Sequence, residues 1–378
     1  MNDIDLLLVS GASGAVGSYL LRQILKKWPD KRVVCVFRTE NSAEKLVRDV
    51  VPEAGGRVIP IIADLTQLGK LEQAISGVEA GERCLAIHCA ADVSWTKTHN
   101  VIDPLNIQGT VRLANAAIRL SRGIPKFVML STAYADFENG AHRNAYEASK
   151  AEAERLLLQQ YEGRLHTCIV RASLVVGSST TGQIARFNGL YPLIRLIALA
   201  ETPCVIADDD HLIDVVPLDW LGTELFAAIE TMMDRTAPLQ VTVAAGEKAI
   251  SIKDVVNIAV ERANEFLLQA GRPKNPVISV ITRRQYDFLM NAAKTWSIDH
   301  HFENIRRISS IMDGYIRHGE SGRVIHPVNT QQPAPDPPEY LPRVVDYWIA
   351  KNAARLQKTR EISWMRWKEE PVRGANVH

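Results

Sequence analysis

The stretch from Leu6 to Gly17, LLLVSGASGAVG, constrains the fold of this chain most. An apolar run that suits a buried parallel strand ends at Ser10, and glycines follow at 11, 14 and 17 with small residues between them. Such glycines permit a sharp turn, close approach of a pyrophosphate, and packing of a helix on a strand. The stretch therefore predicts a strand, a dinucleotide-binding turn and a helix, although ordinary turns are also rich in glycine.

The helix that follows the turn would present its N-terminal amides, which attract phosphate oxygens. The predicted cofactor contacts in this loop are Gly11, Ser13, Gly14, Ala15, Val16 and Gly17.

The residue after the next strand indicates the coenzyme. The strand Arg32 to Phe37 is followed by Arg38, about twenty residues beyond the last loop glycine. Dinucleotide-binding enzymes contact the adenosine ribose at this position. NAD enzymes usually place a carboxylate here, whereas a cation pairs with the 2′-phosphate of NADP. Arg38, with Thr39 and Ser42 as helpers, predicts NADP(H). An ordinary surface arginine is the alternative, and Glu40 lies nearby.

Two further apolar runs, Val58 to Ala63 and Cys84 to Ala91, would bring their carboxyl ends to the same ligand crevice. Asp64 could accept a hydrogen bond from the adenine amino group, or it could cap the next helix. Small residues at the end of the second run leave room for the cofactor. The predicted contacts at these two strand ends are Asp64, Leu65, Ala90 and Ala91.

The catalytic candidates come after the fifth strand, Lys126 to Leu130, which continues into Ser131 and Thr132. A helical segment then carries Tyr146 and Lys150, whose i, i+4 spacing puts both side chains on one face. A nearby ammonium favours the ionised phenol and would lower the pKa of the tyrosine from about 10. Thr132, Tyr146 and Lys150 are therefore predicted to polarise a carbonyl beside a nicotinamide.

A second pair with the same spacing occurs near the end of the chain, at Tyr347 and Lys351. This pair does not follow a strand that ends in Ser-Thr, and it does not follow the nucleotide-binding half. We interpret it as an ordinary helix face.

Over about residues 5 to 260, the chain resembles the extended short-chain dehydrogenase/reductases. The motifs that carry the resemblance occur in that superfamily's order: GASGAVG, HCAAD, NIQGT, the Ser131-Thr132 strand end, YEASK, and Arg171 in IVRASLVVG. HCAADVSW, STAYAD and DVVPLDW are most similar to the fatty acyl-CoA reductases and carrier-protein thioester reductase domains. The resemblance implies that Tyr146 donates the proton and that Lys150 activates it and binds the ribose, with Thr132 at the carbonyl. It also implies that Ala172, Ser173 and Leu174 border the nicotinamide.

The predicted fold class is α/β, a Rossmann-type doubly wound parallel sheet with a smaller, mainly helical C-terminal substrate-binding part. The NADP-binding domain would span residues 1–180 and the substrate-binding region 181–378. Within the second region we expect strands near 211–216 and 239–244 that return to the core, a proline-rich linker at 329–342, and a C-terminal helix at 343–368.

The location of the substrate pocket is predicted from the large apolar segments that the nucleotide-binding fold does not use. The residues after Gly177, the aliphatic helix Leu190 to Leu199 and the helical segment 283–318 would wall an acyl pocket, with plain core packing of the aliphatic helix as the alternative.

The expected function is NADPH-dependent reduction of a carbonyl, most simply an acyl thioester on CoA or a carrier protein, to an aldehyde or alcohol. A ketone or aldehyde reductase, a nucleotide-sugar epimerase or dehydratase, and a non-catalytic NADP(H)-binding regulator stay open. With 44 Lys+Arg against 43 Asp+Glu, the chain has no global field that would attract nucleic acid. We expect no metal, His300-His301 included, no membrane span, a cytoplasmic location, and an oligomeric state that the sequence leaves open.

Overall fold

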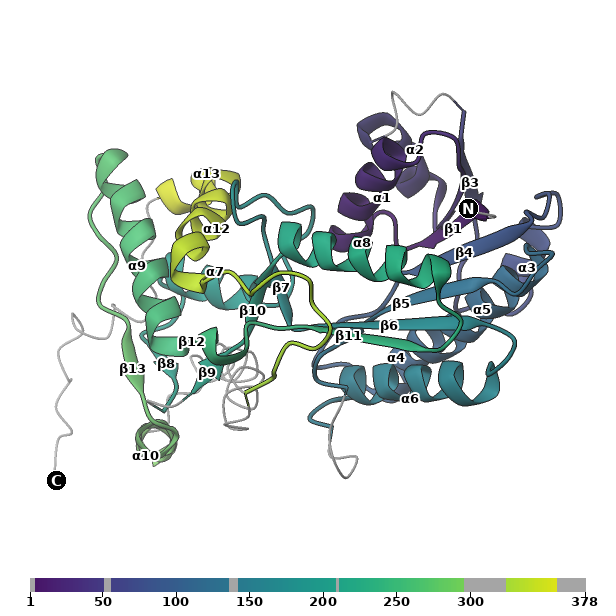
Figure 1. Cartoon of the computed structure of the whole chain (residues 1–378). Helices are drawn as coiled ribbons and strands as arrows, with labels where there is room; N and C mark the ends of the chain where they lie inside the picture. Colours follow the sequence, from purple (N-terminus) through teal and green to yellow (C-terminus); the bar gives the residue numbers. More distant parts are fainter. Residues whose placement is uncertain (1–3, 51–55, 136–141, 209–210, 296–323, 359–378) are drawn as a thin grey trace, which may run out of the picture.

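The structure is a computed structural model, and it describes residues 4–50, 56–135, 142–208, 211–295 and 324–358. A seven-stranded sheet forms its centre (Figure 1). The strands are β1 (Ile4–Ser10), β2 (Arg32–Phe37), β3 (Val58–Ile62), β4 (Arg83–His88), β5 (Lys126–Thr132), β6 (His166–Ala172) and β11 (Leu239–Val243).

Their order is β11-β6-β5-β4-β1-β2-β3, and every neighbouring pair is parallel. The chain order reverses between β1 and β4, which is the switch point where such sheets bind ligands. The predicted doubly wound fold is confirmed.

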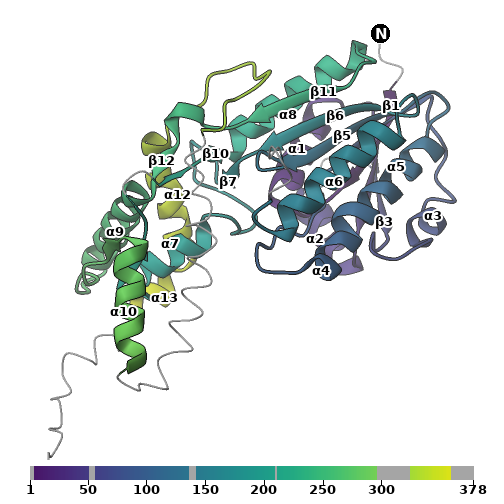
Figure 2. The same cartoon turned by 90° about the horizontal axis from the view of Figure 1, so that it is seen from below.

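Helices cover both faces of the sheet (Figures 1 and 2). One face carries α1 (Ala15–Lys27), α2 (Glu40–Val50) and α8 (Leu218–Asp234). The other carries α3 (Lys70–Ala74), α4 (His99–Asp103), the π-helical turn η1 (Pro104–Gln108), α5 (Gly109–Arg119) and α6 (Ala145–Gln160).

Because successive side chains of a strand point to opposite faces, β1 feeds both hydrophobic cores. Leu7 packs in the cluster that holds α1 and α8, and Leu8 packs in the cluster that holds α5 and α6. The sheet is buried on both sides, so the apolar run at the start of the chain has no solvent-facing positions to alternate with.

The remaining elements gather beside the carboxyl edge of the sheet (Figure 2). The helices are α7 (Tyr191–Ala198), the 3-10 turn η3 (Gly246–Lys248), α9 (Ile252–Gln269), α10 (Arg283–Thr295), α12 (Pro337–Lys351) and α13 (Ala353–Gln357). The strands form three two-stranded pairs, β7 (Leu174–Val176) with β10 (Val215–Pro217), β9 (Leu212–Ile213) with β12 (Ile250–Ser251), and β8 (Cys204–Ile206) with β13 (Ser279–Ile281).

The C-terminal half departs from the expected outline in several places. Strand β11 joins the nucleotide-binding sheet within the segment 239–244 that was expected to return to the core, and α8, from the expected substrate region, packs on the same sheet. The segment 211–216, expected to return as well, instead forms two short strands that pair outside it. Helix α12 begins at Pro337, inside the expected linker, because a proline is well tolerated in the first helical turn. The expected helix 343–368 continues as α13 only to Gln357, and its residues from 359 lie outside the described chain.

Candidate active site

The glycine loop between β1 and α1 has a geometry that only glycine permits. Gly11 has φ +74°, and a Cβ placed there would lie 2.5 Å from the backbone nitrogen of Ala90 at the end of β4. A Cβ on Gly17 would lie 2.2 Å from the carbonyl oxygen of Gly11. Gly14 is the N-cap of α1, with no side-chain cap and no acidic residue in the first helical turn. The loop therefore fits an anionic pyrophosphate at the helix N-terminus.

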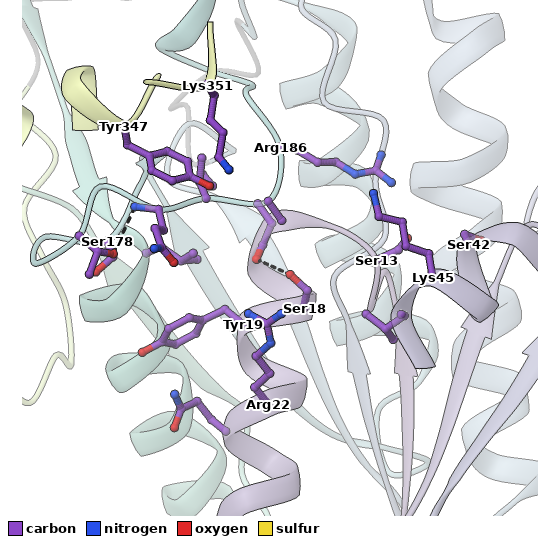
Figure 3. Close-up of a pocket in the computed structure, with 18 residues that line it drawn as sticks. Ser13, Ser18, Tyr19, Arg22, Ser42, Lys45, Ser178, Arg186, Tyr347 and Lys351 are labelled. Carbon is purple, nitrogen blue, oxygen red and sulfur yellow. Dashed lines mark hydrogen bonds between the residues drawn. The ribbon is translucent and has the colours of Figure 1, made fainter. Parts of the chain in front are cut away.

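The ribose end of the crevice is basic. Arg38 is exposed directly after β2, while the Thr39 and Ser42 hydroxyls bond each other at 3.1 Å at the start of α2. Lys45, one turn further along α2, lines a cavity of about 790 Å³ together with Ser13 and Ser42. In Figure 3 the ends of Lys45 and Arg186 point toward one another beside Ser13.

Lys45 and Arg186 were missed from the sequence. The signal for Lys45 was a second cation seven residues after Arg38, on the helix that follows the same strand. Arg186 lies in a segment with no element pattern, and only the fold brings it to the glycine loop.

The predicted adenine contacts lie at the ends of β3 and β4. Asp64 accepts hydrogen bonds from the backbone nitrogen and hydroxyl of Thr66, both at 2.8 Å, through one carboxylate oxygen. Leu65 is buried beside it. Ala90 packs against Gly11, and Ala91 lines the inner cavity described next.

The three predicted catalytic side chains meet in an inner cavity of about 220 Å³, which the glycine loop also lines. Thr132 is the last residue of β5, and Tyr146 and Lys150 lie on the first turns of α6. Asn144 caps that helix by accepting a hydrogen bond from the backbone nitrogen of Glu147 at 2.9 Å. The cap fixes where α6 begins, and thereby the face on which the tyrosine and lysine lie.

The acid–base properties of the pair differ from the sequence expectation. Burial raises the pKa of the Tyr146 phenol, the neighbouring Glu147 raises it further, and a hydrogen bond with Thr132 lowers it. The expected lowering by Lys150 is wrong for this structure, because Lys150 is not among the groups that shift this pKa and desolvation disfavours the phenolate. Burial likewise lowers the pKa of Lys150 to about 8, against an opposing effect of Glu154.

Glu154 lies one helical turn beyond Lys150 and is itself held from the sheet. Its carboxylate accepts hydrogen bonds from the Ser131 hydroxyl and, at 2.7 Å, from Arg171 on β6. All of these groups are buried or nearly so. The carboxylate is thus fixed where it favours the ammonium form of Lys150, a role that the sequence motifs did not reveal.

A second buried network ties α6 to the glycine loop. Asn106, in the π-helical turn η1, donates a hydrogen bond to the Ser149 hydroxyl at 2.9 Å and accepts one from the backbone nitrogen of Asp92 at 2.8 Å. His88 bonds Ser10 at 2.6 Å and Thr110 at 2.9 Å. Burial lowers the pKa of His88 to about 3, so the imidazole is neutral.

The predicted nicotinamide neighbours Ala172, Ser173 and Leu174 all line the inner cavity. The Ser173 hydroxyl donates a 2.5 Å hydrogen bond to Asp214, which also accepts from the backbone nitrogens of Ala245 and Gly246. This carboxylate clamps the end of β6 to the loop after β11. Burial raises the pKa of Asp214 to about 6.

The expectation that the aliphatic helix α7 walls the acyl pocket is wrong. Every residue of α7 except Pro192 and Arg195 is buried, and its apolar side chains pack in a core shared with α9 and α12. Neither cavity is lined by α7. The apolar lining of the inner cavity comes from other segments, including Val93, Trp95 and Ile184. Most of the segment 283–318 lies outside the described residues.

Other predictions are tested only over the described residues. They contain no cluster of three or more His, Cys, Asp or Glu side chains that could hold a metal ion. None of the helices among them is long and apolar enough to cross a membrane. His300 and His301 lie outside this part of the chain.

The sheet order, the glycine loop and the Thr-Tyr-Lys constellation class the chain with the NAD(P)-dependent oxidoreductases of the extended short-chain dehydrogenase/reductase type. The sequence profile described as male sterility protein, an NAD-binding family, matches residues 9–142 and 136–223, more than half of the chain. The chain belongs to this family.

Curated relatives and solved structures agree with this assignment. Fatty acyl-CoA reductase 1 of Xenopus laevis is 24% identical over 279 residues, which cover 59% of this chain and 54% of the relative. The chain thus spans about half the length of the fatty acyl-CoA reductases it matches.

Among solved structures, the terminal R domain of the myxalamid PKS-NRPS biosynthetic pathway has a TM-score of 0.63 and 16% identity, covering 96% of this chain and 94% of its own. A thiolation-reductase di-domain from an archaeal non-ribosomal peptide synthetase has a TM-score of 0.63 and 17% identity, covering 93% and 76%. These likenesses establish the fold.

Proposed function

We propose that the protein is an NADPH-dependent reductase of an acyl thioester. The observation that carries the proposal is the meeting of Thr132, Tyr146 and Lys150 in one cavity with the glycine loop. A carbonyl carbon in that cavity lies within reach of both a proton donor and a bound nicotinamide. The named relatives that are fatty acyl-CoA reductases favour a thioester as the carbonyl substrate.

The reaction balances as one thioester, one NADPH and one proton giving an aldehyde, a free thiol and NADP⁺. The bound dinucleotide supplies a hydride. Hydride addition to the thioester carbon breaks the carbonyl π bond and leaves a hemithioacetal oxygen, to which Tyr146 gives its proton. Collapse of the hemithioacetal breaks the carbon–sulfur bond and releases the thiol. A second NADPH and a second proton would reduce the aldehyde to the alcohol.

Each side chain has a definite part in this scheme. The phenol of Tyr146, whose pKa burial raises, holds its proton at neutral pH and so has a proton to donate. Thr132 donates a second hydrogen bond to the same oxygen. Lys150 holds the ribose hydroxyls and supplies positive charge as the proton leaves the phenol. Asn106 and Glu154 are positioning residues, because they act through α6 and Lys150.

The coenzyme preference follows from the charges at the ribose end. Arg38, directly after β2, and Lys45, on α2, are exposed cations, and Lys45 lines one cavity with the Ser13 and Ser42 hydroxyls. A 2′-phosphate offers these donors a dianion, whereas a free 2′-hydroxyl offers none of them a strong acceptor. Gly11, Gly14, Ala15, Val16 and Gly17 would hold the pyrophosphate that NAD and NADP share. The coenzyme is therefore proposed to be NADP(H).

An apolar part of the inner cavity's wall favours an acyl substrate over a nucleotide sugar. Val93, Trp95 and Ile184 form this part, beside polar lining residues such as Arg186 and Asn188, and it suits an acyl chain. A substrate panel tests the proposal, with NADPH, acyl-CoA thioesters, aldehydes, ketones and UDP- or dTDP-sugars, and with products identified by mass spectrometry. We expect aldehyde or alcohol from the thioesters. Turnover of ketones or nucleotide sugars without thioester reduction would refute it.

A further inference from the structure

The 790 Å³ cavity extends well beyond the coenzyme contacts (Figure 3). It runs along the outer face of α1, between α2, the segment that follows Gly177, and α12. Tyr19 and Arg22 enter it from α1, and Tyr347 and Lys351 enter it from α12. The pair interpreted from the sequence as an ordinary helix face thus lines a cavity.

The cavity is strongly basic. Arg22, Lys45, Arg186 and Lys351 line it, and none of the described residues that line it is an Asp or Glu. All four basic side chains are exposed to its solvent. Lys351 lies over the Tyr347 ring, 5.4 Å from the ring centroid. A cavity with four cations and no acidic lining residue has a positive potential that attracts phosphate groups.

A carboxylate behind this wall, Asp219, already accepts several hydrogen bonds. Asp219 raises the pKa of Tyr19, second to the effect of burial, so it lies near the cavity. Its oxygens accept hydrogen bonds from the Ser178 hydroxyl at 3.0 Å, the Ser179 nitrogen at 2.9 Å and the Ser179 hydroxyl at 2.7 Å. Asp219 therefore fixes the cavity wall and leaves its cations free to bind an anion.

Aromatic rings among the cations narrow the ligand to a nucleotide. Tyr19 and Tyr347 line the cavity, so a base can contact aromatic side chains there, and the arginine and lysine groups offer donors for phosphates. The volume lies within the range of small-molecule sites and exceeds what a single phosphate fills.

The coenzyme itself does not account for the α12 end of the cavity. The predicted adenosine contacts Arg38, Asp64 and Leu65 do not line it among the described residues. Ala15, Ile184 and Arg186 line both the outer and the inner cavity, so the two are adjacent. A ligand with a nucleotide at one end and its reacting carbonyl at the other would occupy both.

We propose that Arg22, Lys351 and the two tyrosines bind the adenosine 3′,5′-bisphosphate end of a CoA thioester. This inference rests on the proposed function. Carrier-bound substrates share the phosphopantetheine phosphate but lack this nucleotide, so the site would favour CoA thioesters over carrier-bound ones.

Direct titration tests the site without turnover. Adenosine 3′,5′-bisphosphate is titrated calorimetrically into the enzyme with and without saturating NADPH. We expect binding in both cases, and a loss of about tenfold or more in affinity in Arg22→Gln and in Lys351→Gln. Lys26→Gln is the matched control, because Lys26 is an exposed cation one turn further along α1 that does not line the cavity. Mutual exclusion of the bisphosphate and NADPH, or unchanged affinity in both variants, overturns the proposal.

Kinetics separate this proposal from the proposed function. One acyl group is compared on CoA, on phosphopantetheine and on N-acetylcysteamine, which lacks any phosphate. In the Arg22→Gln/Lys351→Gln variant, kcat/KM should fall about tenfold or more for the CoA thioester relative to the other two. Equal losses on CoA and phosphopantetheine thioesters overturn the nucleotide assignment. If wild type reduces no thioester, the proposed function fails, and the titration alone then decides the site.

Discussion

Replacing Glu154 with glutamine should move the pH dependence of the enzyme without touching the reacting atoms. Glu154 raises the pKa of Lys150, which burial has lowered to about 8. An opposite charge within about 4 to 6 Å shifts a pKa by one to three units, so loss of the carboxylate should lower the pKa of Lys150 by about one unit. The sign is fixed, because an ammonium that loses its anion gives up its proton at lower pH.

The expected size follows from the titration of one group. At pH 8 the protonated fraction of Lys150 would fall from about one half to about one tenth, whereas at pH 6 it stays near one. The variant should therefore lose about fivefold in kcat/KM at pH 8 beyond its loss at pH 6, with the alkaline limb displaced to lower pH. Profiles of kcat/KM between pH 6 and 9.5 measure this.

Two further variants serve as controls for the role of Glu154. Glu152→Gln removes an exposed carboxylate on the same helix, paired with Arg155 at 2.6 Å, and should leave the profile unchanged. Glu154→Gln also removes the ion pair with the largely buried Arg171, which should lower stability by about 3 to 5 kcal/mol. Glu154→Gln/Arg171→Met removes both members of that ion pair and should keep the displaced limb. A folded variant with the wild-type limb would refute the role of Glu154.

Three more predictions follow from the same geometry. Tyr146→Phe should abolish turnover and leave NADPH affinity within about threefold, because only the transferable proton is lost; more than a tenth of the wild-type rate would contradict this. Arg38→Ala and Lys45→Gln should each weaken NADPH binding by about 1.5 to 3 kcal/mol in titrations while changing NADH binding little, and equal losses for both coenzymes would make these residues structural. Leu196→Ala should lower the free energy of unfolding by about 2 to 5 kcal/mol and leave acyl chain-length preference unchanged, since Leu196 is buried in the core; a changed preference would restore α7 to the substrate pocket.

The nucleotide-binding half was predictable because its signals are local. The run Leu6 to Val9 within β1 is apolar because the sheet is covered on both faces, and the three loop glycines follow it directly in the chain. Tyr146 and Lys150 could be placed on one helix face by spacing alone, and the strand end at Thr132 preceded them. These relations depend on residues that are near one another in the chain.

The rest depends on contacts between distant segments. Glu154 is held by Arg171 from β6, and Arg186 reaches the glycine loop from an irregular segment. Aliphatic character could not tell whether α7 walls a pocket or fills a core, because both environments are apolar. The pKa of Tyr146 was predicted in the wrong direction because spacing reports a neighbouring charge and not the desolvation of a buried phenol.

Transfer of a labelled hydride tests the central claim most directly. The enzyme is incubated with NADPH deuterated on the transferred face of its nicotinamide and with an acyl-CoA thioester, and the products are analysed by mass spectrometry. The proposed reaction predicts an aldehyde with one deuterium at its carbonyl carbon, or an alcohol with two there, together with one free thiol per thioester consumed. Thiol release without deuterium in the carbonyl-derived product, or no consumption of thioester while a ketone or nucleotide sugar is turned over, would contradict it.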